Sequence, residues 1–441
     1  MTEQTLLLGT AKIDITPPVG TLMAGFVARE GKASGVHDRL EANVLLFQSG
    51  EEKLALVMAD LIGVDAALIE EVRRIATRLT DLPATHIVIG AIHTHGGPAV
   101  LRGGFLGEPD PSYLAFLAHS IAVGISQADQ GKEPVKVYSG CGECREVGKN
   151  RRRPGGPTDP EVSVLRFEGA AGTKAVLVNY ACHPVVLGPD NLLITADYPS
   201  YLRQTLSAIY PGALVVFATG AAGNINTGHQ ARASIDGRLG KKRTFAEAQR
   251  LGRILAGEAL KALETATEID NPSLKVKGTT VALPLEKIPS TGEYERMKLE
   301  WEEKYRSLKA AGGSFGEIEE AQLMANWAEK MKQKWSGRSE EPKILCELTV
   351  FTLGDCEFYT LPGEFFFEFG LMLKEARRPR PLFVLGYTNG CIGYVAPEAA
   401  YKEGGYEIDD SYRYYGLPAR LLKGGGEQVV QALLALVKTL S

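Results

Sequence analysis

The sequence has no apolar run of the roughly 18–20 residues that a membrane-spanning helix needs. Its first residues also lack the basic start and apolar core of a secretory signal, so we expect a cytoplasmic protein. Neither sign of charge dominates, because 49 Lys and Arg stand against 53 Asp and Glu. The resulting net charge of -4 argues against a nucleic-acid partner, which usually requires a strongly basic surface.

Cysteine is scarce, with six residues in a chain of 441. The six are scattered, which predicts reduced thiols rather than a disulfide framework. Cys141 and Cys144 have the spacing of redox and zinc motifs, but no second pair completes a four-cysteine site. We therefore favour a structural role for both.

Apolar residues make up 44% of the chain, which is enough for a large core. Strand-length apolar runs alternate with segments of helical periodicity, and no internal repeat is found. The runs of strand length lie at residues 42–47, 54–59, 86–92, 162–167, 175–181 and 213–218. Helical spacing occurs at residues 66–79, 112–125 and 198–209. This alternation predicts an α/β fold with mixed layers of sheets and helices.

A different composition marks residues 293–335, which are rich in Glu, Lys, Ala and Met. They predict a long helix or a helical hairpin that bends at Gly312 and Gly313. Strands are expected again at residues 343–353 and 357–361, followed by a helix, a strand and a last helix. We expect a single catalytic domain of residues 1–441 with a helical insertion at residues 286–340.

Four segments carry side chains suited to metal chemistry, each at the end of an expected strand. His93 and His95 lie in GAIHTHGGP at residues 90–98, and His183 lies in NYACHP at residues 179–184. Glu364 ends LPGE, and Tyr394 ends GYTNGCIGY. Taken singly, each has an ordinary structural interpretation, such as a hydrogen-bonded histidine, a carboxylate at a helix N-terminus, or aromatic packing. Loops that follow strands are nevertheless where ligands gather in α/β sheets.

In this order, the four segments resemble the neutral/alkaline non-lysosomal ceramidases. That family carries an HTHSGP motif, a strand ending in His-Pro, a PGE-F motif and a G-x-x-N…Y segment. Residues 9–17 (GTAKIDITP) and 23–26 (MAGF) are also similar to its opening. The resemblance implies one zinc ion per chain, and a metal-activated water that cleaves the amide bond of a small-molecule N-acyl substrate, lipids included. The implied ligands are His93, His183, Glu364 and Tyr394.

The same resemblance implies roles for three further residues. Tyr406, twelve positions beyond Tyr394, matches a tyrosine that faces the substrate and would stabilise an oxyanion. His95 would lie beside the metal. Arg151 resembles a family arginine that contacts the substrate, although a solvated basic loop is the alternative.

Three positions are candidates for substrate binding. The family's GDVSPN segment reads GNINT here, so Asn224 and Asn226 replace an Asp and a Ser. We expect these amides to bind polar groups, and their presence puts ceramide itself in doubt as the substrate. Asp197 is a further polar candidate, although a helix N-cap suits it better. We also expect the family's C-terminal immunoglobulin-like domain to be missing.

Three alternatives stay open at this stage. A zinc esterase or lactonase could use the same site, because the attack does not require a nitrogen leaving group. A protein that keeps the metal without turnover is a second alternative. A TIM-barrel metal hydrolase also begins with HxH, but His119 and His229 are poor further ligands. The oligomeric state is open.

Overall fold

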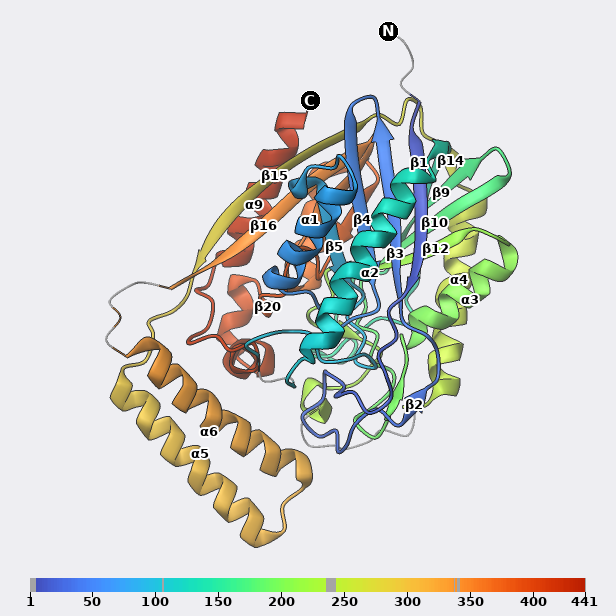
Figure 1. Ribbon diagram of the computed structural model, residues 1–441. Coiled ribbons are helices and arrows are strands. Elements are labelled where there is room, and N and C mark those ends of the chain that lie inside the picture. Colours follow the sequence, from blue (N-terminus) through green and yellow to red (C-terminus); the bar gives the residue numbers. More distant parts are fainter. Residues whose placement is uncertain (1–4, 105–106, 235–242, 337, 339–341, 441) are drawn as a thin grey trace.

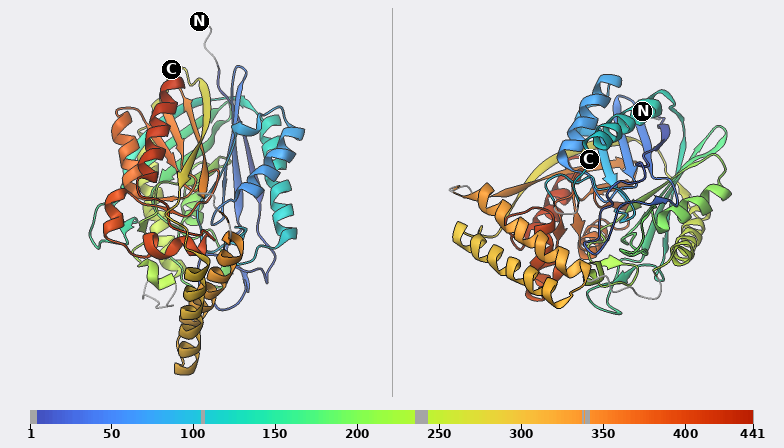
Figure 2. Two further views of the ribbon diagram at one scale, coloured as in Figure 1. Left: turned by 90° about the vertical axis from the view of Figure 1, so that its left-hand side faces the viewer. Right: turned by 60° about the horizontal axis from the view of Figure 1, so that its bottom comes forward.

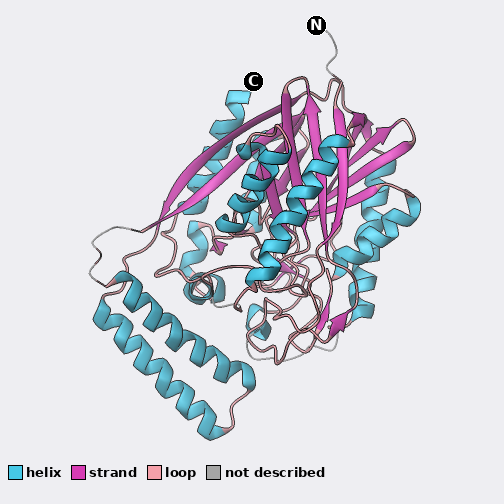
Figure 3. Cartoon of the chain, viewed as in Figure 1, coloured by secondary structure: helices cyan, strands magenta, loops and turns pink. Residues whose placement is uncertain are grey.

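The computed structural model describes residues 5–104, 107–234, 243–336, 338 and 342–440. Three twisted sheets lie at its centre and helices cover their outer faces (Figures 1, 2 and 3). The predicted α/β class with mixed layers is confirmed. In the part of the chain that the structure describes, the strands form separate open sheets rather than a closed parallel barrel, so the TIM-barrel alternative is wrong. No helix in that part is long and apolar enough to span a membrane.

The first sheet is covered by two helices, α1 (Ala66–Leu79) and α2 (Pro111–Gln130). Its strands, in spatial order, are β5 (Ile87–Ala91), β4 (Glu52–Ala59), β3 (Glu41–Ser49), β1 (Leu7–Asp14) and β6 (Glu133–Pro134). Asp65 and Asp110 cap the two helices by accepting hydrogen bonds from backbone N–H groups of the first turn.

The second sheet is built in the same way and covered by α3 (Tyr198–Ile209) and α4 (Phe245–Glu264). Its strands, in spatial order, are β12 (Leu214–Thr219), β10 (Gly172–Tyr180), β9 (Glu161–Gly169), β7 (Lys136–Glu143) and β14 (Thr267–Glu268). Burial raises the pKa of Cys141 to about 11 and also raises that of Cys144. Both thiols therefore stay protonated at neutral pH, which agrees with a structural role.

The third sheet packs against α7 (Phe367–Arg377) and α9 (Gly425–Val437). Its strands, in spatial order, are β15 (Leu274–Pro284), β16 (Lys343–Leu353), β17 (Cys356–Thr360) and β19 (Leu382–Leu385). The inner faces of all three sheets meet in one hydrophobic core. Phe358 stacks there between Phe351 and Phe383, with ring centroids 4.3 and 4.7 Å apart.

The three sheets share one topology. In each, three antiparallel strands are followed by a helix that crosses to a parallel edge strand, as β4 pairs with β5, β10 with β12 and β17 with β19. Such a unit can recur without a repeat of sequence, because many different apolar and polar residues satisfy the same hydrophobic pattern. The carboxyl ends of the parallel strands carry the loops that hold the candidate site.

Residues between β15 and β16 form two helices, α5 (Thr291–Ala311) and α6 (Phe315–Trp335), joined at Gly312 in the left-handed conformation. The hairpin extends from the body of the protein (Figure 1). It contacts the segment that follows the third sheet, because Trp327 Nε1 donates to the carbonyl of Leu417 and the Tyr294 hydroxyl donates to that of Pro418. The predicted helices are thus present, and the division into one domain with an insertion stays a prediction.

Candidate metal centre

Three side chains from the three sheets converge at the carboxyl ends of the strands. His93 follows β5, His183 follows β10, and Glu364 lies in β18 (Glu364–Phe365), just after β17. Each is 1% exposed, and their ligand atoms all lie within 4.8 Å of one another. Glu364 Oε2 is 2.8 Å from His183 Nε2 and 3.4 Å from His93 Nε2.

Backbone geometry, rather than strand alternation, brings the histidines of the HxH segment together. Strand β5 ends at Ala91, and His93 has a φ of 68°, a left-handed conformation that is costly for a residue with a Cβ. Its N–H donates to the carbonyl of Leu61 over 2.9 Å, which holds the turn. The rings of His93 and His95 are 5.0 Å apart and edge to face, although the two residues do not lie on one face of a strand.

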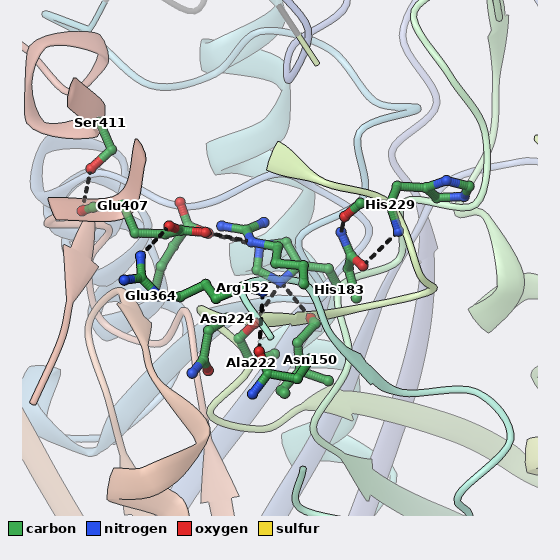
Figure 4. A network of polar contacts seen from close by, with 12 residues as sticks. Asn150, Arg152, His183, Ala222, Asn224, His229, Glu364, Glu407 and Ser411 are labelled. Atoms are coloured by element: carbon green, nitrogen blue, oxygen red, sulfur yellow. Dashed lines mark hydrogen bonds and ion pairs between the residues drawn. The ribbon is translucent and has the colours of Figure 1, made fainter. Parts of the chain in front are cut away.

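Backbone carbonyls fix the tautomer of both candidate ligands. His93 Nδ1 donates to the carbonyl of Ile62 over 2.6 Å, and His183 Nδ1 donates to that of Ala222 over 2.7 Å (Figure 4). Burial lowers the pKa of His93 to about 4 and that of His183 to about 3, so both rings are neutral at pH 7. With the proton on Nδ1, each Nε2 presents a lone pair toward the carboxylate.

This arrangement fits a divalent cation. Two bare imidazole nitrogens and a carboxylate oxygen repel one another at these distances unless a positive charge lies between them. Histidines that ligate metals donate their other N–H to a carbonyl or carboxylate, as both do here. The donor set of two nitrogens and one carboxylate is that of a catalytic zinc site, which leaves a position open.

The same burial predicts an acid-sensitive fold when the metal is removed. Below about pH 6.5, the ordinary pKa of histidine, both residues are protonated in the unfolded chain but stay neutral in the folded chain. The free energy of unfolding therefore falls as the pH falls. We expect each of the two histidines to cost about 1.4 kcal/mol per pH unit between roughly pH 6.5 and 4. Urea unfolding of the chelated chain across this range measures the slope, which should be shallower in the variant His183→Gln. A flat profile would contradict the prediction.

Three tyrosines surround the cluster, and only one of them was predicted. Tyr394 in β20 (Tyr394–Val395) pairs with Glu364 across two short parallel strands. The hydroxyl of Tyr415 donates to Glu364 Oε1, and the ring of Tyr387 stacks on His93 with centroids 4.2 Å apart. Tyr387 lay inside a recognised motif, whereas nothing local distinguishes Tyr415 from the tyrosines beside it.

Arg151 lies beside the cluster and is not a solvated loop residue. Its side chain is 6% exposed, and its Nε donates to Glu407 Oε1 over 2.8 Å. Its guanidinium lies 5.2 Å from the ring centre of Tyr394. Arg152 donates to the other oxygen of Glu407 over 2.7 Å (Figure 4). Arg151 Nη2 is buried without a hydrogen-bond partner in the described part of the chain, so one donor remains for a ligand.

Two further predicted residues lie close to these groups. The ring of Tyr406 is 5.8 Å from that of Tyr394, and burial raises the pKa of Tyr406, which keeps its proton at neutral pH. His95 Nε2 is 3.3 Å from His93 Nε2. Its Nδ1 is buried and has no hydrogen-bond partner among the described residues. Burial also lowers the pKa of His95, so this ring is neutral as well.

The three candidates for substrate binding use their polar atoms within the protein. Asn224 accepts from the N–H of Phe367 over 3.0 Å and thereby holds the start of α7. Asn226 accepts from the N–H groups of residues 228 and 229, which closes a turn. Asp197 caps α3 by accepting from the N–H of Tyr198, and burial raises its pKa to about 6. Their contact with substrate stays a prediction.

Comparison with known proteins finds ceramidases among the relatives of this chain. Residues 6–206 match the family model described as neutral/alkaline non-lysosomal ceramidase, N-terminal. The neutral ceramidase of Pseudomonas aeruginosa is 24% identical over 90% of this chain and 68% of its own length. That of Mycobacterium tuberculosis is 25% identical over 60% of this chain, but the match spans less than half of that relative, 46%.

Solved structures share the fold. The crystal structure of neutral ceramidase from Pseudomonas aeruginosa has a TM-score of 0.75 at 19% identity, covering 98% of this chain and 74% of the other. A ceramidase complexed with C2 also has a TM-score of 0.75, at 17% identity, covering 98% and 75%. With the ordered motifs and their convergence, these findings support a relationship of the chain to the neutral/alkaline non-lysosomal ceramidase family, whose model matches residues 6–206.

Proposed function

We propose that this protein is a zinc-dependent hydrolase that cleaves the amide bond of an N-acyl compound. The observation that carries the proposal is the convergence of His93, His183 and Glu364, with both imidazole tautomers set for a metal. Relatives that bear the name neutral ceramidase support the choice of an amide bond. Tyr394, the backbone partner of Glu364, is the proposed fourth ligand.

A zinc ion bound here would act as a Lewis acid and lower the pKa of a water molecule toward about 7. The surrounding residues supply the other requirements of amide hydrolysis. The neutral phenol of Tyr406 and the free Nη2 of Arg151 are hydrogen-bond donors for the negative charge that develops on the carbonyl oxygen. His95, neutral and next to His93, would take a proton from the attacking water and pass it to the leaving nitrogen.

The two alternative functions differ in how they fit these contacts. An ester fits the same groups, because its carbonyl develops the same charge. The non-catalytic alternative depended on the replacements at Asn224 and Asn226. Since both amides hold the backbone of neighbouring segments, their presence is explained without loss of turnover.

The test is metal analysis together with a substrate panel on the purified full-length chain. We expect about one zinc per chain, and turnover of N-acyl amides that chelation abolishes and added zinc restores. Matched acyl esters measure the alternative. Stoichiometric zinc without turnover of any amide or ester would overturn the proposal in favour of a binding protein, and faster cleavage of esters would assign an esterase.

Tyr415 should tune the metal site even though it is not a proposed ligand. Its hydroxyl donates to Glu364 Oε1 and so orients the carboxylate. Loss of such a supporting hydrogen bond typically costs roughly 10–100-fold in metal affinity or activity. We expect Tyr415→Phe to weaken zinc binding by this factor, measured by competition with a chelator. Tyr412→Phe is the control, because the Tyr412 hydroxyl contacts Arg413 instead. Equal zinc affinities in the two variants would contradict the prediction.

A further inference from the structure

Two arginines are buried close to the metal centre. Arg29 is 8% exposed and Arg243 is 7% exposed. Both lie over the ring of Phe26, with guanidinium carbons 4.9 and 5.4 Å from its centre. They come from distant parts of the sequence, the loop after β1 and the start of α4, so the fold has brought two positive charges together.

Neither guanidinium is fully satisfied. Arg29 donates to the carbonyls of Ala24 and His95 over 2.6 and 2.7 Å, which leaves its Nε without a partner. Among the described residues, Arg243 donates to the carbonyl of Leu187 over 3.1 Å, and its Nε and Nη1 have no partner there. In the part of the chain that the structure describes, no carboxylate forms an ion pair with either. Buried arginines are usually paired with an anion because an uncompensated buried charge costs several kcal/mol.

Asp190 and Asp197 attract the two arginines electrostatically, but among the described residues neither forms an ion pair with them. Asp190 is exposed, and Asp197 uses one oxygen on the N–H of Tyr198 and the other on that of Leu187. Burial, opposed by Asp190 and assisted by repulsion from Arg243, lowers the pKa of Arg29 to about 9, so this side chain stays charged at neutral pH. Burial also lowers the pKa of Arg243, against the attraction of Asp197 and Asp190. The pair therefore offers two cations and three free nitrogen donors to a ligand.

The location ties this pair to the reacting centre. The ring of Phe26, on which both arginines lie, contacts the ring of His95 with centroids 4.9 Å apart. His95 in turn contacts His93, a proposed zinc ligand. An anion bound at the arginines would thus lie near the scissile bond of a substrate held at the metal. An uncharged substrate would leave the two cations without a partner.

We propose that Arg29 and Arg243 bind an anionic group, a carboxylate or a phosphate, on the N-acyl substrate. The inference rests on the proposed function for the position of the amide bond. It narrows the substrate class to N-acyl compounds that carry a negative charge beside that bond, and it assigns the pair a role in specificity. Electrostatic complementarity of this kind selects among substrates, because the arginines stay unpaired when the charge is missing.

Three octanoyl amides test the inference: N-octanoylglycine, N-octanoylethanolamine phosphate and the neutral N-octanoylethanolamine. We expect kcat/KM of the zinc-loaded chain to be at least about tenfold higher for one of the two anionic amides than for the neutral amide. The anionic amide with the higher kcat/KM shows whether the site prefers a carboxylate or a phosphate. Arg243→Gln should lower this ratio by about tenfold or more. Arg250→Gln, which removes the same charge from an exposed ion pair on α4, should leave the ratio unchanged. Arg29 is not replaced in this test, because its guanidinium also donates to two backbone carbonyls.

A binding measurement separates this inference from the proposed function. Calorimetric titration of the chelated full-length chain with N-octanoylglycine and with N-octanoylethanolamine phosphate needs no turnover. At least one anion should bind about tenfold more weakly to Arg243→Gln than to Arg250→Gln. Equal affinities of the two variants for both anions, or an unchanged kcat/KM ratio, would overturn the inference while amide hydrolysis stands. Weaker anion binding by Arg243→Gln in a chain without turnover would support the anion site and count against the hydrolase.

Discussion

Replacing His183 by alanine should deplete the chain of zinc and abolish measurable hydrolysis. Nε2 of His183 is the nitrogen nearest Glu364 Oε2, at 2.8 Å, so the variant would leave one imidazole and one carboxylate. Loss of a mere supporting hydrogen bond costs roughly 10–100-fold in metal affinity, and loss of a ligand should cost more. We therefore expect a fall in kcat/KM well beyond a hundredfold.

Metal content and activity of the folded variant measure this effect. His183 also donates to backbone carbonyls, so circular dichroism and urea unfolding must first establish that the variant folds, with His183→Gln as a second variant. His119→Ala is the matched control, because His119 is exposed on α2 and its ring Nδ1 contacts the carbonyl of Ala115 in the same helix. A folded His183→Ala chain with one zinc and full activity would show that the ligand assignment is wrong.

The sequence predicts the three-residue cluster because each ligand has a local signal. His93, His183 and Glu364 all follow apolar strands, and each lies next to glycine or proline residues that shape a loop. Strand ends meet at one edge of the fold, so residues far apart in sequence could be expected together. The spacing of His93 and His95 alone would suggest one face of a strand, but both lie beyond β5, and a left-handed turn at His93 places them side by side.

The other residues around the site have no local signal. Tyr415 reaches Glu364 only because the chain folds back after Tyr406, and the tyrosines next to it point elsewhere. Arg29 and Arg243 are separated by more than two hundred positions, and in isolation each is an ordinary loop arginine. Whether their N–H groups have partners depends on how deeply the side chains are buried and on which carboxylates lie nearby. The sequence records neither.

The common topology of the three sheets was also invisible in the sequence. Hydrophobic alternation specifies strands and their buried faces, but it does not record which strand pairs with which. Each sheet places one parallel pair at its edge, and each pair contributes a loop to the site. The metal centre therefore depends on how the three sheets are held together, which makes the contacts between them matter for function.

One such contact is the buried ion pair between Asp60, just after β4, and Arg203 on α3. Two hydrogen bonds of 2.7 and 2.6 Å join them, and Asp60 is 0% exposed. Replacing Arg203 by methionine would leave the carboxylate buried without its partner. Breaking a buried pair in this way typically costs about 3–5 kcal/mol, and we expect a loss of that size in the free energy of unfolding, measured in urea at pH 7.5.

The pair should also affect the metal, because Asp60 directly precedes the two carbonyls that hold His93. Leu61 accepts from the His93 N–H over 2.9 Å, and Ile62 accepts from its Nδ1 over 2.6 Å. Weaker zinc binding should therefore accompany the loss of stability in Arg203→Met. The control is Arg250→Met, which breaks an arginine–carboxylate pair on the surface of α4 and should cost about 1 kcal/mol or less. A similar loss of stability in the two variants would show that burial of the Asp60–Arg203 ion pair does not account for its contribution to stability. If Arg203→Met lost stability but bound zinc normally, the turn at His93 would be held by its own backbone hydrogen bonds alone.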